Sequence, residues 1–173
     1  QRALASTKRI LHLLSIEAQI TDGDEHLPLA EVKGHMKVEN VEFAYSDGRE
    51  IIKGLTLDIP AGDTVAIVGA TGAGKSTVIK LLLRYYDATT GRVTLDGHDL
   101  RDLKLADVHH AIGLVSQDVF LFHGTVRENI AYGTFDAKDE DIIAAATIAE
   151  AHDFIMELPN GYETIVGERG QKL

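Results

Sequence analysis

The sequence predicts an α/β fold, and three features of the chain carry that prediction. Residues 65–68 form a short, continuous apolar run, which is typical of a parallel strand buried on both faces. A glycine-rich loop follows at residues 69–74, and the apolar spacing of residues 76–86 then predicts a helix. Residues 36–43 and 55–59 alternate apolar and polar side chains, which indicates two strands of a small antiparallel sheet.

The glycine-rich loop matches the phosphate-loop pattern G-x-x-x-x-G-K-[ST] at every fixed position of residues 69–76. A loop that wraps phosphates turns its backbone N–H groups inward, and glycines keep side chains out of the way. Lys75 supplies a positive charge toward the β- and γ-phosphates, and the Ser76 hydroxyl is placed to ligate Mg²⁺. The match therefore predicts nucleotide binding. The predicted binding residues are Gly69, Ala70, Thr71, Gly72, Ala73, Gly74, Lys75, Ser76 and Thr77.

Composition narrows the function classes further. The chain has 173 residues and a net charge of −10, which disfavours nucleic acid as the main ligand because phosphate backbones require a basic patch. The acidic chain has a local group of basic residues around the loop, which are Lys75, Lys80 and Arg84. The sequence has no cysteine, which excludes disulfides and thiolate zinc sites. No apolar run approaches the roughly 18 residues of a membrane span.

The first 35 residues precede the expected sheet. The spacing of apolar residues in residues 1–20, with basic residues near the start, predicts an amphipathic helix. Taken alone, the residues allow two alternatives: a helix packed on the domain, or a connector that arrives from another part of the protein. Residues 21–35 hold Asp22-Gly23-Asp24-Glu25 and Pro28 and show no periodicity, so they are expected to be a linker.

The two alternating strands are separated by a predicted turn. The first strand breaks its alternation at Asn40, which predicts a β-bulge. Residues 46–49 have turn composition, and Pro60-Ala61-Gly62 is expected to turn the chain into the phosphate-loop strand.

The second half of the chain is expected to continue the α/β alternation. Residues 112–115 form another short apolar run and predict a second buried strand, which leads into Ser116-Gln117-Asp118. The helix predicted at 139–151 begins with three acidic residues, where the helix dipole favours them. The other expected elements are a strand at 92–95, helices at 103–110, 125–131 and 152–158, and a loop at 162–173.

Two further residues are candidates for the site. Tyr45 follows the first strand, where its ring either stacks on a purine or caps the strand end. Gln117 follows the second buried strand, and ligands of open α/β sheets bind at the carboxyl ends of strands. Its amide either orients water and completes a Mg²⁺ shell, or faces solvent.

Several segments of the chain match the motifs of one family in the expected order. They are residues 41–45, 54–62, 68–77, 91–97, 115–118, 121–130 and 162–170. On these motifs the chain, from about residue 36 to its end, resembles the nucleotide-binding domain of an exporter-type ABC transporter. Residues 162–170 resemble the loop that contacts the membrane domains in exporters.

The resemblance implies a role for each candidate residue. Tyr45 matches the adenine-stacking aromatic, and Gln117 matches the glutamine that touches Mg²⁺ and the attacking water. The implied cofactors are ATP and Mg²⁺, the implied metal ligands are Ser76 and Gln117, and the implied catalytic residues are Lys75 and Gln117.

The resemblance also implies an organisation of the chain. Residues 1–20 resemble the connector helix that follows a membrane domain, residues 21–35 a linker, and residues 36–173 the N-terminal portion of an ABC ATP-binding domain. The signature L-S-G-G-Q would begin where this sequence stops, at Leu173. We therefore expect a P-loop NTPase core with an antiparallel β subdomain and part of a helical subdomain, incomplete at its C-terminus and without the catalytic glutamate.

The function that the resemblance implies is ATP binding and, in the intact protein, ATP hydrolysis that powers export. The expected partners are the transmembrane domain of the same transporter and a second nucleotide-binding domain, at the cytoplasmic face of a membrane. Nucleic acid is not an expected partner. The 173 residues alone are expected to be inactive, and a non-catalytic nucleotide-binding module is the alternative. The transported substrate and the identity of the second domain stay open.

Overall fold

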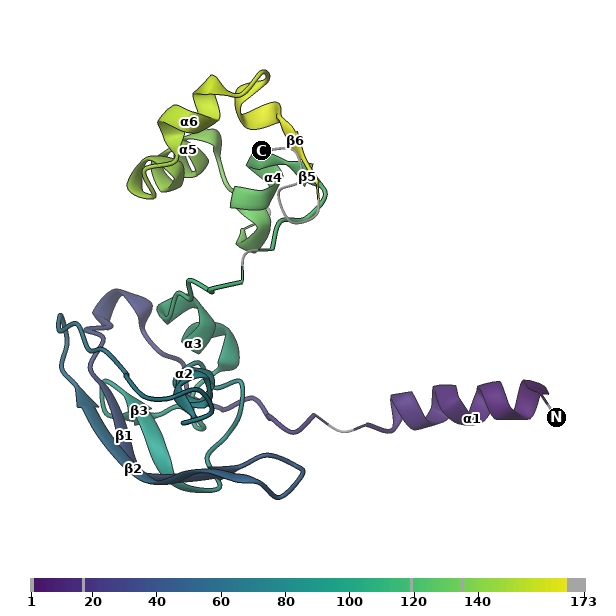
Figure 1. The fold of residues 1–173 in the computed structure, drawn as a ribbon, viewed down its shortest axis with the longest axis vertical. Helices are drawn as coiled ribbons and strands as arrows, with labels where there is room; N and C mark the ends of the chain where they lie inside the picture. The colour runs from purple at the N-terminus through teal and green to yellow at the C-terminus, as the bar shows by residue number, and fades with distance from the viewer. Residues whose placement is uncertain (1, 17, 119, 135, 168–173) are drawn as a thin grey trace. The chain divides into compact units, whose positions relative to one another are not determined.

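The computed structural model describes residues 2–16, 18–118, 120–134 and 136–167 (Figure 1). Internal contacts divide the chain into two compact units, residues 1–114 and residues 115–173, and each is described by itself. The residues Glu168, Arg169 and Gly170 of the predicted membrane-domain loop lie outside the described residues.

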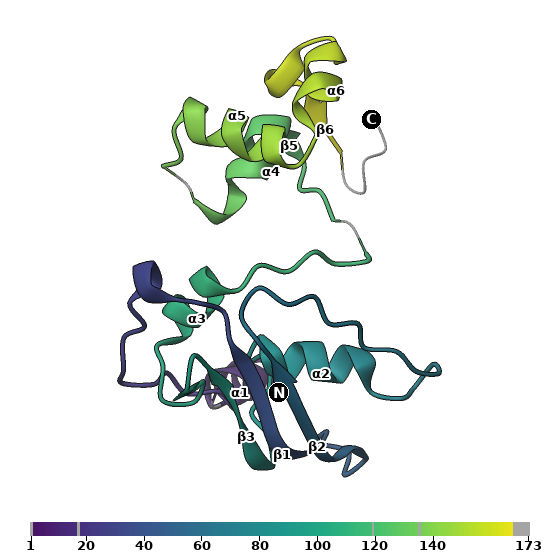
Figure 2. The same ribbon diagram turned by 90° about the vertical axis from the view of Figure 1, so that its left-hand side faces the viewer.

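The first unit is built on a four-stranded antiparallel sheet with the order β2-β1-β3-β4 (Figure 2). Strand β1 spans Met36–Ala44 and pairs with both β2 (Glu50–Ile59) and β3 (Thr90–Leu95). A two-residue strand, β4 (His98–Asp99), completes the order. The predicted antiparallel subdomain is therefore confirmed. The predicted bulge is confirmed as well, because Asn40 has a φ of 46° and the β1–β2 register shifts between Val38 and Val41.

Strand β2 begins five residues before the predicted strand. Its first half pairs with the end of β1, where Ile52 lies opposite Phe43 and Glu50 lies opposite Ala44. The alternation of side chains fails there because the ladder is irregular, and Gly54 has a φ of 72°. The sequence of residues 50–54 does not show the alternation of a strand, but pairing with β1 extends β2 over them.

Helix α2 (Lys75–Leu82) follows the phosphate loop and shares one hydrophobic core with the sheet. Val78, Leu81 and Leu82 are its buried apolar residues. The helix ends before residue 86, where the prediction placed its end, because Arg84 adopts a left-handed conformation with a φ of 52°. Helix α3 (Leu105–Ala111) begins two residues after the start of the helix predicted at 103–110 and buries Val108 in the same core.

The two predicted buried strands are wrong for this structure. Residues 65–68 and 112–115 have no strand assignment, and Val68 and Val115 are 86% and 98% exposed. A parallel strand needs hydrogen-bonded neighbours, and no strand of the described residues pairs with either segment. An apolar hollow of about 600 Å³ lies between β2 and residues 65–68.

The segment expected as a linker lies against the start of α3. The Gly23 N–H donates to Leu103 O (3.2 Å), and the Glu25 N–H donates to Asp102 O (2.9 Å). A Cβ atom on Gly23 would lie 2.2 Å from Asp102 O, so only glycine allows this approach. The segment also contains the 3-10 helix η1 (Leu29–Glu31) and the buried side chain of Leu27.

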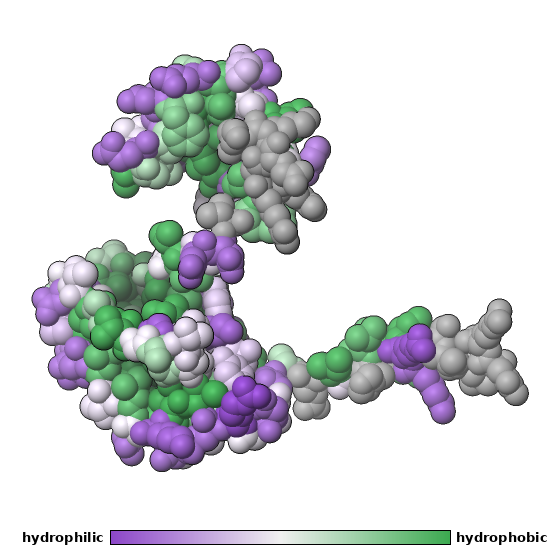
Figure 3. Space-filling model, viewed as in Figure 1, coloured by the Kyte–Doolittle hydropathy of each residue, from purple (hydrophilic) through white to green (hydrophobic). Residues whose placement is uncertain are grey.

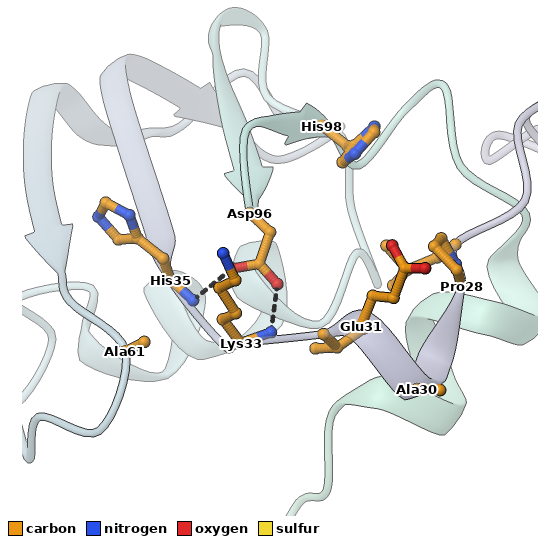
Figure 4. Close-up of a pocket in the computed structure, with 10 residues that line it drawn as sticks. Pro28, Ala30, Glu31, Lys33, His35, Ala61, Asp96 and His98 are labelled. Carbon is orange, nitrogen blue, oxygen red and sulfur yellow. Dashed lines mark hydrogen bonds between the residues drawn. The ribbon is translucent and has the colours of Figure 1, made fainter.

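Asp96 fixes the end of that segment to the sheet. Its carboxylate accepts backbone N–H bonds from Lys33 (2.8 Å), Gly34 (3.2 Å) and His35 (2.9 Å), two of which are drawn in Figure 4. Burial by itself raises the pKa of Asp96, but the three backbone donors and the charge of Lys33 outweigh it and hold that pKa below its ordinary value.

Arg84 joins three segments with one guanidinium group. Its side chain is 2% exposed and pairs with Asp87 (3.2 Å). Its two terminal nitrogens donate to Leu103 O (3.1 Å) and to Thr21 O (2.8 Å). The C-terminal end of α2 is thereby tied to the segment at residues 21–25 and to the residues that precede α3.

The second unit has a small core of its own. A short antiparallel pair joins β5 (Gly124–Thr125) to β6 (Ile165–Val166), which the predicted loop at 162–173 missed. Thr125 and Glu128 form a capping box at the start of α4 (Val126–Ile130), and Arg127 pairs with Glu163 (2.6 Å) and with Asp139. The remaining elements are η2 (Ala131–Gly133), α5 (Asp139–Ile148), α6 (His152–Glu157) and η3 (Gly161–Glu163).

Helix α1 spans Arg2–Leu14 and confirms that the first residues are helical. Its apolar residues Ile10, Leu11, Leu13 and Leu14 are exposed by 57% or more, and Figure 3 shows hydrophobic side chains along the helix. Within the described part of the chain, no helix combines the length and the apolar character needed to cross a bilayer.

Replacing Arg84 by alanine is expected to lower the free energy of unfolding by about 2–4 kcal/mol, because it leaves Asp87 and two carbonyl groups without their donor. Urea denaturation measures the change. Arg49→Ala is the control, since the Arg49 side chain is 74% exposed, and it is expected to cost less than about 0.5 kcal/mol. Equal effects of the two variants would contradict the structural role of Arg84.

Replacing Asp96 by asparagine is expected to cost about 1 kcal/mol at neutral pH, because a neutral amide accepts the three backbone bonds less strongly. The lowered pKa of Asp96 means that its contribution is present above the pKa of the unfolded chain and is lost as pH falls through the folded-state pKa. The gap in stability between the wild type and Asp96→Asn should therefore close as the pH falls below the ordinary aspartate pKa of 3.8. Urea denaturation at several pH values tests this, with the exposed Asp63→Asn as control; a gap that stays constant would contradict it.

Candidate functional site

The phosphate loop at residues 69–74 leads directly into α2. Gly72 and Gly74 have φ values of 83° and 89°, a region that favours glycine, and Gly74 is the N-cap of the helix. Two of the three loop glycines therefore stand where the backbone turns back toward the helix.

Gly74 is needed for a second reason. A Cβ atom at this position would lie 3.0 Å from Ile51 Cγ2 and 3.0 Å from Ile52 Cδ1 of strand β2. The loop thus lies directly on the sheet. The two ends of the loop lie close together, since a Cβ atom on Gly69 would lie 3.3 Å from Ala73 Cβ.

The Lys75 side chain folds back into the loop. Its Nζ atom donates to Gly69 O (2.8 Å) and to Ala70 O (2.9 Å). A further loop bond runs from the Ala73 N–H to Ala70 O (3.1 Å). The ammonium group therefore lies against the first two residues of the loop, which the sequence assigns to phosphate binding.

The first turn of α2 begins directly after the phosphate loop. The first backbone bonds at this end are donated by Thr77 and Val78 to Gly74 O (2.9 and 3.0 Å), and the amides of Lys75 and Ser76 precede them. Unpaired N–H groups and the positive end of the helix dipole favour an anion at such a position. Ser76 is exposed, whereas Thr77 is buried.

The structure brings Tyr45 to this turn from the end of β1. The Tyr45 hydroxyl is 3.1 Å from Thr77 Oγ1, and either group can be the donor. Tyr45 also lines a hollow of about 390 Å³. The other lining residues are Gln19, Ile20, Phe43, Ala44, Ser46, Tyr86, Asp87 and Thr89.

The basic residues near the loop divide between two tasks. Arg84 is buried in its three-way contact, so the expectation that it adds charge around the loop is wrong. Lys80 Nζ lies 6.0 Å from the centroid of the Tyr45 ring and 5.9 Å from that of Tyr86. Lys80 was not predicted as a site residue, although it lies three positions after Thr77 and hence on the same side of the helix.

Gln117 belongs to the second unit and is exposed. The structure groups Tyr45 with residues 69–77 in the first unit, and Gln117 is described only within the second. Among the described residues, no three histidine or carboxylate side chains are grouped so as to hold a metal ion.

The loop fits a polyphosphate. The loop has glycine turns at Gly72 and Gly74, the ammonium group of Lys75 beside it and a helix N-terminus directly after it, and phosphate-binding loops are built from these groups. The exposed Ser76 hydroxyl fits a magnesium ligand beside such a phosphate.

A family model described as "ABC transporter" matches residues 52–170. The chain is 42% identical over 173 residues to an ATP-dependent lipid A-core flippase of Syntrophus aciditrophicus, covering 100% of this chain and 29% of that protein. It is 43% identical over 173 residues to a putative multidrug export ATP-binding/permease protein of Bacillus subtilis, covering 99% of this chain and 30% of that protein. The chain thus spans about 30% of the length of these relatives.

Among solved structures, a bacterial Atm1-family ABC exporter with ATP bound has a similar fold. The TM-score is 0.86 at 39% sequence identity, and the match covers 99% of this chain and 30% of that chain. The predicted α/β fold of the P-loop NTPase class is confirmed by this match, apart from the two unpaired segments described above.

Replacing Gly74 by alanine is expected to destabilise the first unit by about 1–3 kcal/mol, because the new Cβ meets two isoleucines and the φ of 89° strains any L side chain. Thermal denaturation measures the loss. Gly113→Ala is the matched control, since nothing lies within 4 Å of its Cβ position, and it should leave stability unchanged. Wild-type stability of Gly74→Ala would contradict the described loop geometry.

Proposed function

The chain belongs to the ABC transporter family, and from this premise we propose that it binds ATP together with Mg²⁺. Within a complete transporter, the bound ATP is hydrolysed and the reaction powers export of a substrate across a membrane. The observation that carries the proposal is the phosphate loop, where the Lys75 ammonium lies on Gly69 and Ala70 and helix α2 begins directly after Gly74.

In the proposed complex, residues 69–77 hold the phosphates. Lys75 now bonds two loop carbonyls, and its ammonium exchanges them for β- and γ-phosphate oxygens when nucleotide enters. Tyr45 stacks on the adenine ring. Ser76 and Gln117 are the Mg²⁺ ligands, and the metal ion would neutralise phosphate charge. In catalysis, Lys75 stabilises phosphate charge and Gln117 orients the attacking water.

The proposal extends to the organisation of the whole protein. Residues 1–20 connect the ATP-binding domain to a membrane domain of the same transporter, residues 21–35 are the linker, and residues 36–173 belong to the ATP-binding domain. The partners are that transmembrane domain and a second nucleotide-binding domain, at the cytoplasmic face of a membrane. One relative is named as a lipid A-core flippase and another as a putative multidrug export protein. The proposed substrates of this protein are accordingly a lipid or a drug-like molecule.

A non-catalytic nucleotide-binding module is the second candidate. The unpaired residues 65–68, which lead into the loop, favour it for these 173 residues, because hydrolysis requires closely positioned groups around the phosphate. The two candidates differ in whether the complete transporter releases phosphate from ATP. Phosphate release that Lys75→Ala abolishes assigns the ATPase.

Titration calorimetry of this chain with Mg-ATP is expected to give saturable heat. Lys75→Ala is expected to weaken binding by about 10- to 100-fold, the loss of one or two charge-assisted hydrogen bonds. Lys53→Ala is the matched control, because the Lys53 side chain is 71% exposed and pairs with Glu50 (3.5 Å), and it should bind like the wild type.

Two results would contradict the proposed function. One is the absence of saturable heat from the wild type at millimolar Mg-ATP while its thermal denaturation remains cooperative. The other is equal affinity of Lys75→Ala and the wild type, which would place the nucleotide away from the loop.

A further inference from the structure

The Tyr45 ring is fixed by its neighbours before any ligand binds. Its centroid lies 4.9 Å from that of Phe43 at an interplanar angle of 84°, and 5.3 Å from that of Tyr86 at 88°. Both contacts are edge-on, which is a favourable geometry for aromatic pairs. The backbone is fixed as well, since the Gly48 N–H donates to Tyr45 O (2.9 Å) and the Tyr45 N–H to Arg49 O (3.2 Å).

The hydroxyl of Tyr45 ties this ring to helix α2. It reaches Thr77 Oγ1, 32 residues along the chain and in the first turn of α2. Thr77 is buried, and its own N–H donates to Gly74 O, the last residue of the phosphate loop. A continuous path of two hydrogen bonds therefore links the aromatic ring to the loop backbone.

We propose that the Tyr45–Thr77 hydrogen bond sets the distance between the base-stacking ring and the phosphate loop, so that Thr77 is a positioning residue for the nucleotide base. The inference rests on the proposed function, because it concerns the same nucleotide. A nucleotide has a rigid base and a triphosphate joined by a ribose. Both ends bind at full strength only when the two protein surfaces are held at the matching separation.

The proposal separates two contributions to affinity. Inorganic tripolyphosphate has no base, so its binding depends on the phosphate loop alone. ATP depends on the loop and on the ring. Removing the tether leaves the ring with its edge contacts and the Lys80 ammonium over its face, and the cost falls on ATP alone.

The experiment compares Mg-ATP and Mg-tripolyphosphate binding by calorimetry for the wild type and Tyr45→Phe. The phenylalanine keeps the ring and its edge contacts and loses only the hydroxyl. ATP binding is expected to weaken about two- to tenfold, the value of one net hydrogen bond, whereas tripolyphosphate binding stays at the wild-type value. Tyr45→Ala, which also removes the ring, should weaken ATP binding further.

One control accompanies these variants. Tyr85→Phe removes a hydroxyl from a half-exposed ring that contacts His109 (5.8 Å between centroids), and it should bind both ligands like the wild type. Thermal denaturation of each variant verifies that it is folded.

Three outcomes overturn the proposal. Tyr45→Phe binding ATP like the wild type shows that the tether has no positioning role. Equal weakening of both ligands shows a structural effect on the loop. Wild-type ATP affinity of Tyr45→Ala shows that the ring does not contact the base. Failure of the proposed function is a different result, in which the wild type itself binds neither ligand.

Discussion

Helix α2 is fixed at both ends, and the geometry of the phosphate loop depends on that constraint. At its N-terminal end, Thr77 bonds the hydroxyl of Tyr45 and Gly74 lies directly on two isoleucines of β2. At its C-terminal end, the buried guanidinium of Arg84 joins the helix to Thr21, which precedes the strands of the sheet, and to Leu103, which follows them. An eight-residue helix is too short to be stable alone, so these contacts and its buried face determine where its first turn points.

Features encoded by neighbouring residues were predictable from the sequence. The bulge at Asn40 follows from a break in alternation, and the start of α5 at Asp139 follows from its acidic first turn. The phosphate loop was predictable for the same reason, because its chemistry is carried by eight consecutive residues. Tyr45 could be assigned only through the resemblance to a family, since no local pattern brings it to Thr77.

Features that depend on distant partners were not predictable. Apolar composition alone predicted strands at residues 65–68 and 112–115, but a strand forms only where a neighbour accepts its hydrogen bonds. The polar segment at residues 21–35 shows no periodicity, yet Gly23 and Leu27 pack closely against the domain. The role of Arg84 also depends on distant partners. Its charge indicated a place near the phosphates, whereas its burial among backbone carbonyls makes it structural.

The unpaired backbone of residues 65–68 connects sheet formation to ligand capture. These residues run directly into Gly69, so any neighbour that pairs with them orders the first part of the phosphate loop. By thermodynamic linkage, a bound nucleotide then favours that pairing to the same extent that the pairing favours the nucleotide. The dissociation constant of the isolated chain equals the intrinsic constant divided by the fraction of molecules with an ordered loop. Affinity for nucleotide thereby becomes a gauge of how completely the sheet around the loop has assembled.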